Sequence, residues 1–428
     1  MNGLKKLFTE SDNITRDSYI WNTLSATFFA VQSTIALVVI THTGAQEDAG
    51  IFSIAYAVGS LMYYIGEYGV RKYQVSDVNE EMSFTDYHSH RVAACTIMLL
   101  VSLVCVARGY FFSGYSSRKA YIVLMVCLIK VVEAYSEVYF GRFQQVGRLD
   151  VSAKTNFYRT MVGLAGGCVA LVITHDLAIS ITVWFVLTVL AMLTSSILVY
   201  RDFGTIELKF NWDKVLRIFI ECFPLFIGYF MMNYIGNAPK YAIDATMTDL
   251  DQANYNYIFM PVFAVGLFAN FIFNPILVKL ARRWDESKIR AFVKIVLRQL
   301  LVIAGITLLA IAVALTIGCP VLGILFNADV SPFRTELTIL MVGGGMLALV
   351  NFFSVVVTVM RYQKHLIAGY VVIAVLALLL AQKAVLGYGL RGAAVLYTIL
   401  MGMLALIFAF VTFWFIHKKS STLRSDAA

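Results

Sequence analysis

The sequence predicts an all-α integral membrane protein with about twelve transmembrane helices. Three observations support this fold class: apolar segments of membrane-spanning length recur along the chain, the connections between them are short, and 60% of the residues are hydrophobic while only 14% are charged. The mean hydropathy is +0.76. A helix needs about 20 apolar residues to cross about 30 Å of hydrocarbon. The segments lack the alternation of membrane β-strands, so they are expected to be helices.

The apolar segments are expected to form two lobes of six helices around a central cavity. The first lobe covers residues 18–200, a cytoplasmic linker covers 201–214, and the second lobe covers 215–416. Polar residues 1–17 precede the lobes as a segment that is not a signal peptide, and a tail covers 417–428. In chain order, the spans are placed at 18–41, 50–69, 92–112, 120–141, 155–174, 178–200, 215–236, 253–277, 293–317, 334–358, 365–385 and 392–416.

A short repeat supports the division into two similar lobes. Arg142-Phe143-Gln144 follows the fourth span, and Arg361-Tyr362-Gln363 follows the tenth, 219 residues later. Repeats of this kind are common in transporters. Of the 34 Lys and Arg residues, 24 lie in one set of alternating loops, seven lie in the other set and three lie inside spans. Because basic loops stay in the cytoplasm, both termini are predicted to be cytoplasmic. The net charge of +8 therefore reflects membrane topology and not nucleic-acid binding.

Charged residues inside the fourth span are the first pointers to function. A charge at the bilayer centre costs about 2.5–3.5 kcal/mol, so such residues face protein or water. Lys130, Glu133 and Glu137 are spaced to share one helical face. They are expected to form the wall of a polar cavity, although a Lys130–Glu133 ion pair that only fixes helix packing is an alternative.

Other charges lie near the ends of spans, where their cost is small. Glu67 and Arg71 have the i, i+4 spacing of a helical ion pair, and Arg217 and Glu221 repeat it with the signs reversed. Arg159 and Arg298 lie about one turn inside their spans, where snorkelling to the interface is one explanation.

The end of the seventh span carries a polar stripe. Asn233, Asn237, Lys240 and Asp244 recur every three or four residues, and Pro239 interrupts them. This pattern predicts a broken helix that lines a cavity, because irregular backbone inside a membrane is tolerated only there. An ordinary outer loop with Lys240 among the headgroups is the alternative. Further kinks or local unwinding are expected at three prolines: Pro224, Pro261 and Pro275.

The sequence also contains two glycine clusters and a pair of closely spaced histidines. Gly163, Gly166 and Gly167, and the triplet at 343–345, are expected to let helices approach closely. His88 and His90 share a predicted loop without further ligands at metal-binding spacing. No metal site, catalytic residue or bound cofactor is therefore expected.

Four stretches together resemble the polysaccharide-transporter family, the Wzx-type flippases of lipid-linked oligosaccharides. That family belongs to the superfamily of the multidrug MATE exporters and the lipid II flippase MurJ. The stretches are EYGVRKYQVSD (67–77), YFGRFQQVGRLD (139–150), NAPKY (237–241) and FIFNPILVKLARRW (271–284). The resemblance extends over the whole twelve-span layout, and its specificity comes from the order and positions of the stretches.

The resemblance implies a cargo and a mechanism. The cargo is an undecaprenyl-pyrophosphate-linked oligosaccharide, moved across the cytoplasmic membrane by alternating access of two lobes. On this chain the resemblance makes Lys240 and Arg71 candidate ligands of the pyrophosphate, and the mid-span position adds Lys130. Sugar hydroxyls are expected to bond to four polar residues: Gln32, Tyr135, Asn233 and Asn237.

Coupling and partners are less constrained by the sequence. Glu133 or Glu137 is a candidate for coupling the cycle to H⁺ or Na⁺. Membrane lipids are expected partners, and a polysaccharide polymerase is a further candidate. A MATE-like exporter of small molecules and a transporter of teichoic-acid precursors remain alternatives. A membrane polymerase or glycosyltransferase is disfavoured because the chain lacks a large external loop on which to build a catalytic site.

Overall fold

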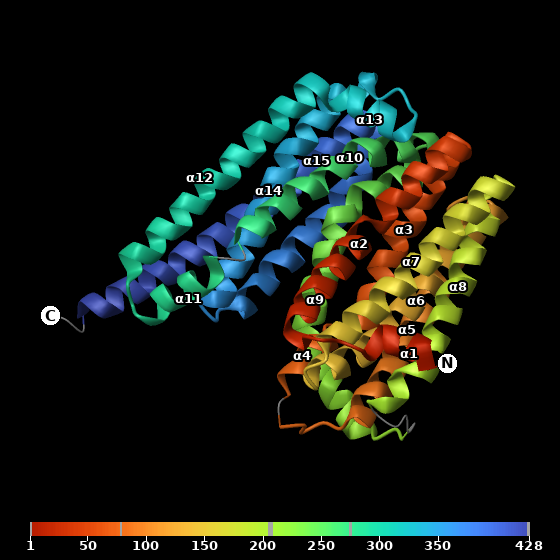
Figure 1. The fold of residues 1–428 in the computed structure, drawn as a ribbon. Coiled ribbons are helices and arrows are strands. Elements are labelled where there is room, and N and C mark those ends of the chain that lie inside the picture. Colours follow the sequence, from red (N-terminus) through yellow and green to blue (C-terminus); the bar gives the residue numbers. More distant parts are fainter. Residues whose placement is uncertain (1, 78, 204–208, 274–275, 426–428) are drawn as a thin grey trace. The chain divides into compact units, whose positions relative to one another are not determined.

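The computed structural model describes residues 2–77, 79–203, 209–273 and 276–425. These residues are almost entirely helical, and no strand occurs among them, which confirms the predicted all-α class. Contacts divide the chain into two compact units, Met1–Phe230 and Met231–Ala428. Figure 1 shows that each unit is built from long helices that lie side by side.

Unit 1 contains eight complete helices and the first part of a ninth. Their bounds are α1 Asn2–Thr9, α2 Ile14–Thr43, α3 Gln46–Glu67, α4 Val70–Ser76, α5 Phe84–Phe112, α6 Ser117–Gln145, α7 Leu149–Thr174, α8 Leu177–Leu198 and α9 Trp212–Thr246, with a short 3₁₀ turn η1 at Tyr200–Asp202. Helix α6 lies at the centre, where it packs against α3, α5, α7 and α8. Polar side chains on α6 are therefore enclosed by protein.

Unit 2 contains the remainder of α9 and six further α-helices. Their bounds are α10 Asp249–Phe273, α11 Leu277–Asp285, α12 Ile289–Val313, α13 Cys319–Phe326, α14 Arg334–Val359 and α15 Leu366–Ser425; the short elements are η3 Ala314–Gly318, η4 Ser331–Phe333 and η5 Gln363–His365. Helix α14 packs against α10, α12 and α15. The helical α15 contains one break, at Gly389, whose φ of 58° is unfavourable for residues with a Cβ. The break separates the segments expected to be the last two spans.

The boundary between the units falls inside α9, whereas the sequence placed a linker at 201–214. The reason is that the first half of α9 packs on unit 1. The rings of Tyr68 and Phe226 stack with centroids 4.4 Å apart. Within the same unit, Lys72 donates a hydrogen bond to Tyr229 and Tyr73 donates one to Glu221.

Nine segments among the described residues are long and apolar enough to cross a membrane, judged by length and composition. Each of the twelve predicted spans overlaps a helix of the structure. Helix α6 is outside the nine, since its central stretch carries Lys130, Glu133 and Glu137. The number twelve stays a prediction, but the chain is a multi-pass membrane protein.

Local unwinding, one of the two outcomes expected at Pro224 and Pro261, does not occur, and the interruption expected at Pro239 does not occur either, while a kink at these prolines stays a prediction. Helix α9 continues through Pro224 and Pro239, and α10 continues through Pro261. Packed neighbours in a membrane protein can satisfy the backbone groups that a proline releases, so a proline need not end a helix there. Pro275 lies outside the described residues.

The prediction that glycines allow close helix approach is confirmed. A Cβ on Gly163 of α7 would lie 2.8 Å from Trp184 Cδ1 of α8, and one on Gly343 of α14 would lie 2.7 Å from Tyr397 Cδ1 of α15. Real Cβ atoms do not approach other atoms this closely, so both helix pairs depend on the missing side chain.

Candidate functional site

Lys130 and Glu133 form a buried ion pair in unit 1. Lys130 Nζ lies 2.7 Å from Glu133 Oε2, and each residue is 3% exposed. Nζ also donates to the Tyr56 hydroxyl at 3.2 Å and lies over two aromatic rings, 4.4 Å from the Tyr56 centroid and 5.2 Å from that of Phe29. The lysine therefore faces protein, not lipid, and a carboxylate, a hydroxyl and two ring faces replace its hydration.

Glu137, one turn after Glu133 on α6, forms a second ion pair with Arg71 of α4. Arg71 Nη1 lies 2.9 Å from Glu137 Oε2, while Nη2 donates to Gln144 at 3.2 Å and to Ser152 at 3.4 Å. The side chains are 26% and 13% exposed, so this pair is more open than the Lys130 pair.

The expected pairing of Arg71 with Glu67 is replaced by this contact because the helix ends between them. Tyr68 and Gly69 have φ values of 54° and 72°, in the left-handed region, so α3 stops at Glu67 and α4 starts again at Val70. Glu67 instead accepts the Gly69 N–H at 2.8 Å. The second expected pair does form, with Arg217 Nε 2.7 Å from Glu221 Oε1.

Two further buried cations were missed as site residues. Arg159 is 2% exposed, which rules out snorkelling, and its Nη2 donates to Asn156 Oδ1 at 2.7 Å. Arg91 is fully buried and donates to the Gly66 carbonyl. The span expected at 92–112 left Arg91 in the preceding loop, and the span expected at 155–174 held Arg159 only one turn from its end. In the structure α5 begins at Phe84 and α7 at Leu149, eight and six residues earlier than expected. The longer helices carry these arginines into the unit.

The same extension of α5 corrects the environment of the histidines. His88 and His90 lie in the helix, not in a loop, and they are 2% and 0% exposed. His88 Nε2 lies 2.8 Å from the Tyr135 hydroxyl, so Tyr135 already has a protein partner.

Some buried polar atoms of unit 1 have no hydrogen-bond partner among the described residues. They include both ring nitrogens of His90 and both amide atoms of Gln32. An unmet buried polar group costs about 1–3 kcal/mol, so these atoms have capacity for water or another polar molecule.

In unit 2, Lys240 is buried inside a helix and not placed in an outer loop. It is 5% exposed, its Nζ donates to Asn256 Oδ1 at 2.8 Å, and it lies 4.7 Å from the ring centroid of Phe259. The broken helix expected here is wrong, since α9 continues to Thr246. Asn237 donates to the Asn233 carbonyl at 3.1 Å, so these two amides form a local pair on the same helix.

The expected residues thus fall into two sets, one in each unit. Arg71, Lys130, Glu133 and Glu137 belong to unit 1, and Asn233, Asn237 and Lys240 belong to unit 2. Each unit holds at least one buried lysine, and buried cations of this kind suit the binding of an anion that must leave water. The central cavity between the lobes stays a prediction.

Arg71 yields a testable expectation because its partner is also charged. Arg71→Gln leaves Glu137 without its cation, whereas Arg71→Gln with Glu137→Gln removes both charges. We expect the single variant to melt at a lower temperature than the double variant, by an amount that corresponds to at most about 1–3 kcal/mol for a partly exposed pair. Melting of the detergent-purified protein measures this. Equal melting temperatures would show that the pair contributes no coupling.

Comparison with known protein families shows the family of this chain. The family described as "Polysaccharide biosynthesis protein" matches residues 16–281, which is more than half of the chain. The chain belongs to this family. The chain is also similar to the capsular polysaccharide biosynthesis protein CapF of Staphylococcus aureus, with 20% identity over 389 residues that cover 90% of this chain and 94% of CapF.

Solved structures share the fold at low sequence identity. The inward-facing form of a multidrug resistance MATE transporter superposes with a TM-score of 0.65 and 11% identity, over 93% of this chain and 96% of that one. The lipid II flippase MurJ in an inward closed conformation gives 0.68 and 14%, over 92% and 87% of the two chains. The resemblance stated from the four sequence stretches is confirmed, and the family has the fold of these transporters.

Proposed function

We propose that the protein is a flippase that moves an undecaprenyl-pyrophosphate-linked oligosaccharide across the cytoplasmic membrane for surface polysaccharide biosynthesis. The observation that carries the proposal is a buried lysine in each unit, Lys130 and Lys240, in a multi-pass chain of a polysaccharide biosynthesis family. The residues act by binding and not by catalysis, so the protein is a transporter and not an enzyme.

The physical problem of this transport is the pyrophosphate. Removing water from two anionic groups in hydrocarbon is prohibitive, so a flippase must replace that hydration with fixed donors. Lys130, Lys240 and Arg71 supply cationic donors, and Asn233 and Asn237 supply amides for sugar hydroxyls. The polyprenyl tail needs no such help, since it stays in lipid throughout. Alternating access of two lobes then exposes the bound headgroup to each side in turn.

The two ion pairs suggest how transport of the cargo could be coupled to H⁺ or Na⁺. Lys130 and Arg71 each bind a carboxylate in this structure, Glu133 and Glu137 respectively. If the pyrophosphate takes over a cation, its carboxylate loses a partner and gains affinity for H⁺ or Na⁺. Uptake of such an ion by Glu133 or Glu137 would then be linked to binding of the cargo, and loss of the ion to its release. Both termini are placed in the cytoplasm on the basis of the loop charges, and a polymerase is a candidate partner.

Two other cargoes remain second candidates. A small-molecule exporter is favoured by the fold shared with a MATE transporter, and a teichoic-acid precursor would offer the same lipid pyrophosphate chemistry. A polymerase or glycosyltransferase has no support from the geometry described above.

The proposal is tested with the purified protein in vesicles that contain a fluorescent undecaprenyl-pyrophosphate oligosaccharide. The measurement is the fraction of glycan that a membrane-impermeant glycosidase can cut. We expect this fraction to rise from about one half, for a carrier confined to its leaflet, towards completion when the protein is present. The control is vesicles with the Lys130→Met/Glu133→Met/Lys240→Met variant, which removes both lysines without leaving Glu133 as an unpaired buried charge. If the wild-type protein does not raise the fraction of cut glycan but does export cationic dyes, the flippase proposal is wrong and the protein is a small-molecule exporter.

A further inference from the structure

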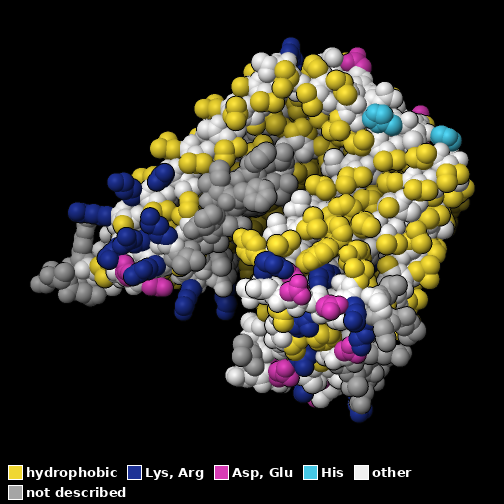
Figure 2. Space-filling view, in the orientation of Figure 1, with side chains coloured by type: hydrophobic (Ala, Val, Ile, Leu, Met, Phe, Trp, Pro, Cys, Tyr) yellow, Lys and Arg dark blue, Asp and Glu magenta, His cyan; other side chains and the backbone are white. Residues whose placement is uncertain are grey.

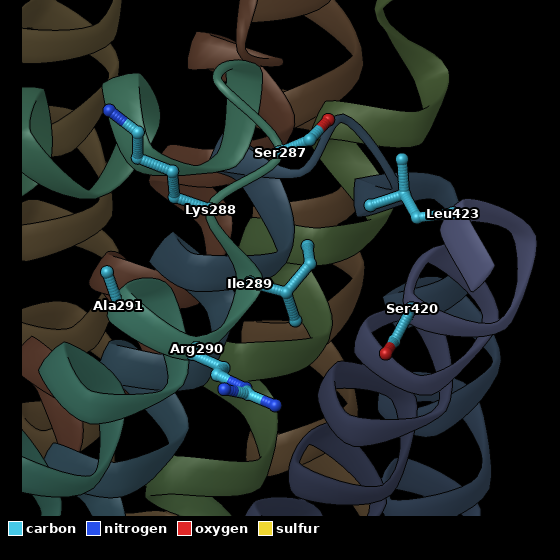
Figure 3. Close-up of a pocket in the computed structure, with 7 residues that line it drawn as sticks. All are labelled: Ser287, Lys288, Ile289, Arg290, Ala291, Ser420 and Leu423. Atoms are coloured by element: carbon cyan, nitrogen blue, oxygen red, sulfur yellow. The ribbon is translucent and has the colours of Figure 1, made fainter. Parts of the chain in front are cut away.

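A cavity of about 470 Å³ lies at one end of unit 2, where α12 begins and the C-terminal part of α15 passes. Its walls combine charged, polar and apolar side chains, namely Arg290, Ser420, Ile289, Ala291 and Leu423. In Figure 3 the Arg290 guanidinium and the Ser420 hydroxyl extend towards the space between the two helices, while the Lys288 side chain points away from it. The cavity thus presents a cation and a hydroxyl beside an apolar wall.

The wall formed by α15 is held in place by a contact with α11. Lys419 Nζ donates to the Trp284 carbonyl at 2.5 Å and lies 4.2 Å from the centroid of the Trp284 ring. Trp284 in turn packs on Phe292 of α12, with ring centroids 5.1 Å apart. Three helices are therefore joined around the cavity, and the positions of Ser420 and Leu423 follow from that packing.

The basic residues around the cavity outnumber the nearby carboxylates. Glu286 already binds Arg282 at 2.8 Å, Lys288 at 2.9 Å and Arg283 at 3.4 Å. Hydrogen bonds from Lys288 and Arg282 lower the pKa of Glu286 to about 2, so this carboxylate is ionised and fully engaged. Figure 2 shows Lys and Arg side chains gathered at this end of unit 2, with few acidic ones.

Three cations on α12 are left for another anion. Arg290, Lys294 and Arg298 are exposed, and none of them forms an ion pair with a carboxylate in the described part of the chain. They follow at intervals of four residues and so share one helical face. At 1.5 Å per residue they extend over about 12 Å of the helix. The headgroup region of one leaflet is about 5–8 Å thick, so this row of cations is long enough to extend across it.

The same face of α12 becomes apolar beyond Arg298. Leu301 is 75% exposed, Leu308 66% and Leu309 65%, although they lie on a helix long enough to cross the membrane. The exposed stripe thus begins basic and continues aliphatic. Phospholipids have the same order of chemistry, with a phosphate followed by acyl chains, and no soluble anion matches both parts.

We propose that this face, together with the cavity beside it, is a binding site for an anionic phospholipid of the leaflet that this end of unit 2 faces. Arg290 and Ser420 bind the phosphate at the cavity, Lys294 and Arg298 add electrostatic attraction to its negative charge, and the acyl chains lie along Leu301 and Leu308. Basic pockets between transmembrane helices bind anionic headgroups in this way. The site is separate from the proposed cargo residues and takes a resident membrane lipid.

The test measures lipid binding and needs no transport assay, so its failure is distinguishable from failure of the proposed flippase function. Full-length protein in detergent is titrated with phosphatidylglycerol or phosphatidylcholine, and bound lipid is counted by native mass spectrometry. Basic residues near an anionic surface contribute about fivefold each to binding. We expect Arg290→Gln/Lys294→Gln to weaken phosphatidylglycerol binding by about 25-fold, with little change for phosphatidylcholine.

Two further variants make the result specific. Arg361→Gln/Lys364→Gln removes the same charge from exposed residues of unit 2 outside the cavity and should leave binding unchanged. Ser420→Trp fills the cavity without changing the charge and should weaken binding as the double variant does. Equal losses in both charge pairs would show diffuse attraction, and full binding by Ser420→Trp would exclude the cavity. If inorganic phosphate displaces the lipid at equal concentration, the site is one for free anions and the proposal is wrong.

Discussion

Replacing Lys130 by methionine is expected to lower the stability of the protein and to abolish surface polysaccharide. The lysine and Glu133 are both 3% exposed, so the single substitution leaves a buried carboxylate without its cation. Breaking a buried pair in this way costs about 3–5 kcal/mol, among the largest effects of single substitutions. Loss of polysaccharide alone would therefore not separate an unfolded protein from an inactive one.

A second substitution separates packing from transport. Lys130→Met with Glu133→Met replaces the pair by apolar side chains, a change that is often neutral or stabilising by about 1–4 kcal/mol. We expect the double variant to recover the wild-type melting temperature but to remain without polysaccharide, because it lacks the cation and the candidate coupling carboxylate. Normal polysaccharide in the stable double variant would show that the pair only fixes the packing of α6.

Lys240→Met is expected to abolish surface polysaccharide with a much smaller loss of stability. The observed hydrogen-bond partner of this lysine is a neutral amide, Asn256, so the substitution leaves no buried charge behind from that contact. The expected cost is about 1–3 kcal/mol, the desolvation of one unpaired acceptor. Removing a buried cation that binds a phosphate should weaken cargo binding by about 2–5 kcal/mol, or about 30-fold or more.

The conservative variant Lys240→Arg is the matched control, since it keeps the charge at the same position. Surface polysaccharide is measured by antibody or lectin binding to cells, and the amount of membrane protein by immunoblot. We expect Lys240→Arg to retain part of the export and Lys240→Met to accumulate lipid-linked precursor on the cytoplasmic side. Wild-type polysaccharide with Lys240→Met at normal protein levels would remove Lys240 from the mechanism.

The contrast between the two lysines was not visible in the sequence. Each lysine has a carboxylate within one turn of its own helix, Glu133 three residues after Lys130 and Asp244 four residues after Lys240, so the sequence treats the two alike. The partner of Lys240 is Asn256, which lies on another helix, 16 residues away. Spacing within one helix predicts contacts only up to one or two turns, so the second pairing required the packing of α9 on α10.

The ends of the helices were harder to predict from the sequence than the helices themselves, and this affected the placement of several buried residues. The predicted spans were cut to the thickness of the hydrocarbon. As a result His90 and Arg91 fell just outside the span at 92–112, and Arg159 fell only about one turn inside the span at 155–174. The helices continue into polar sequence, and that sequence is buried against neighbouring helices. Hydropathy measures preference for lipid, and it therefore misses helical turns that are enclosed by protein.

The sequence by itself determined the all-α membrane class and the order of the spans, because long apolar segments and short loops leave the chain few alternatives. It also indicated the family, through the resemblance of four short stretches. The pairs Lys130–Glu133 and Arg217–Glu221 follow from spacing within one helix, but only the tertiary structure decided which charges meet across helices. Arg71 reaches Glu137 and not Glu67 because two left-handed residues end α3 between them. The lysines turn inward because the aromatic and polar side chains of neighbouring helices replace their hydration, and such contacts form only when segments distant in the sequence pack together.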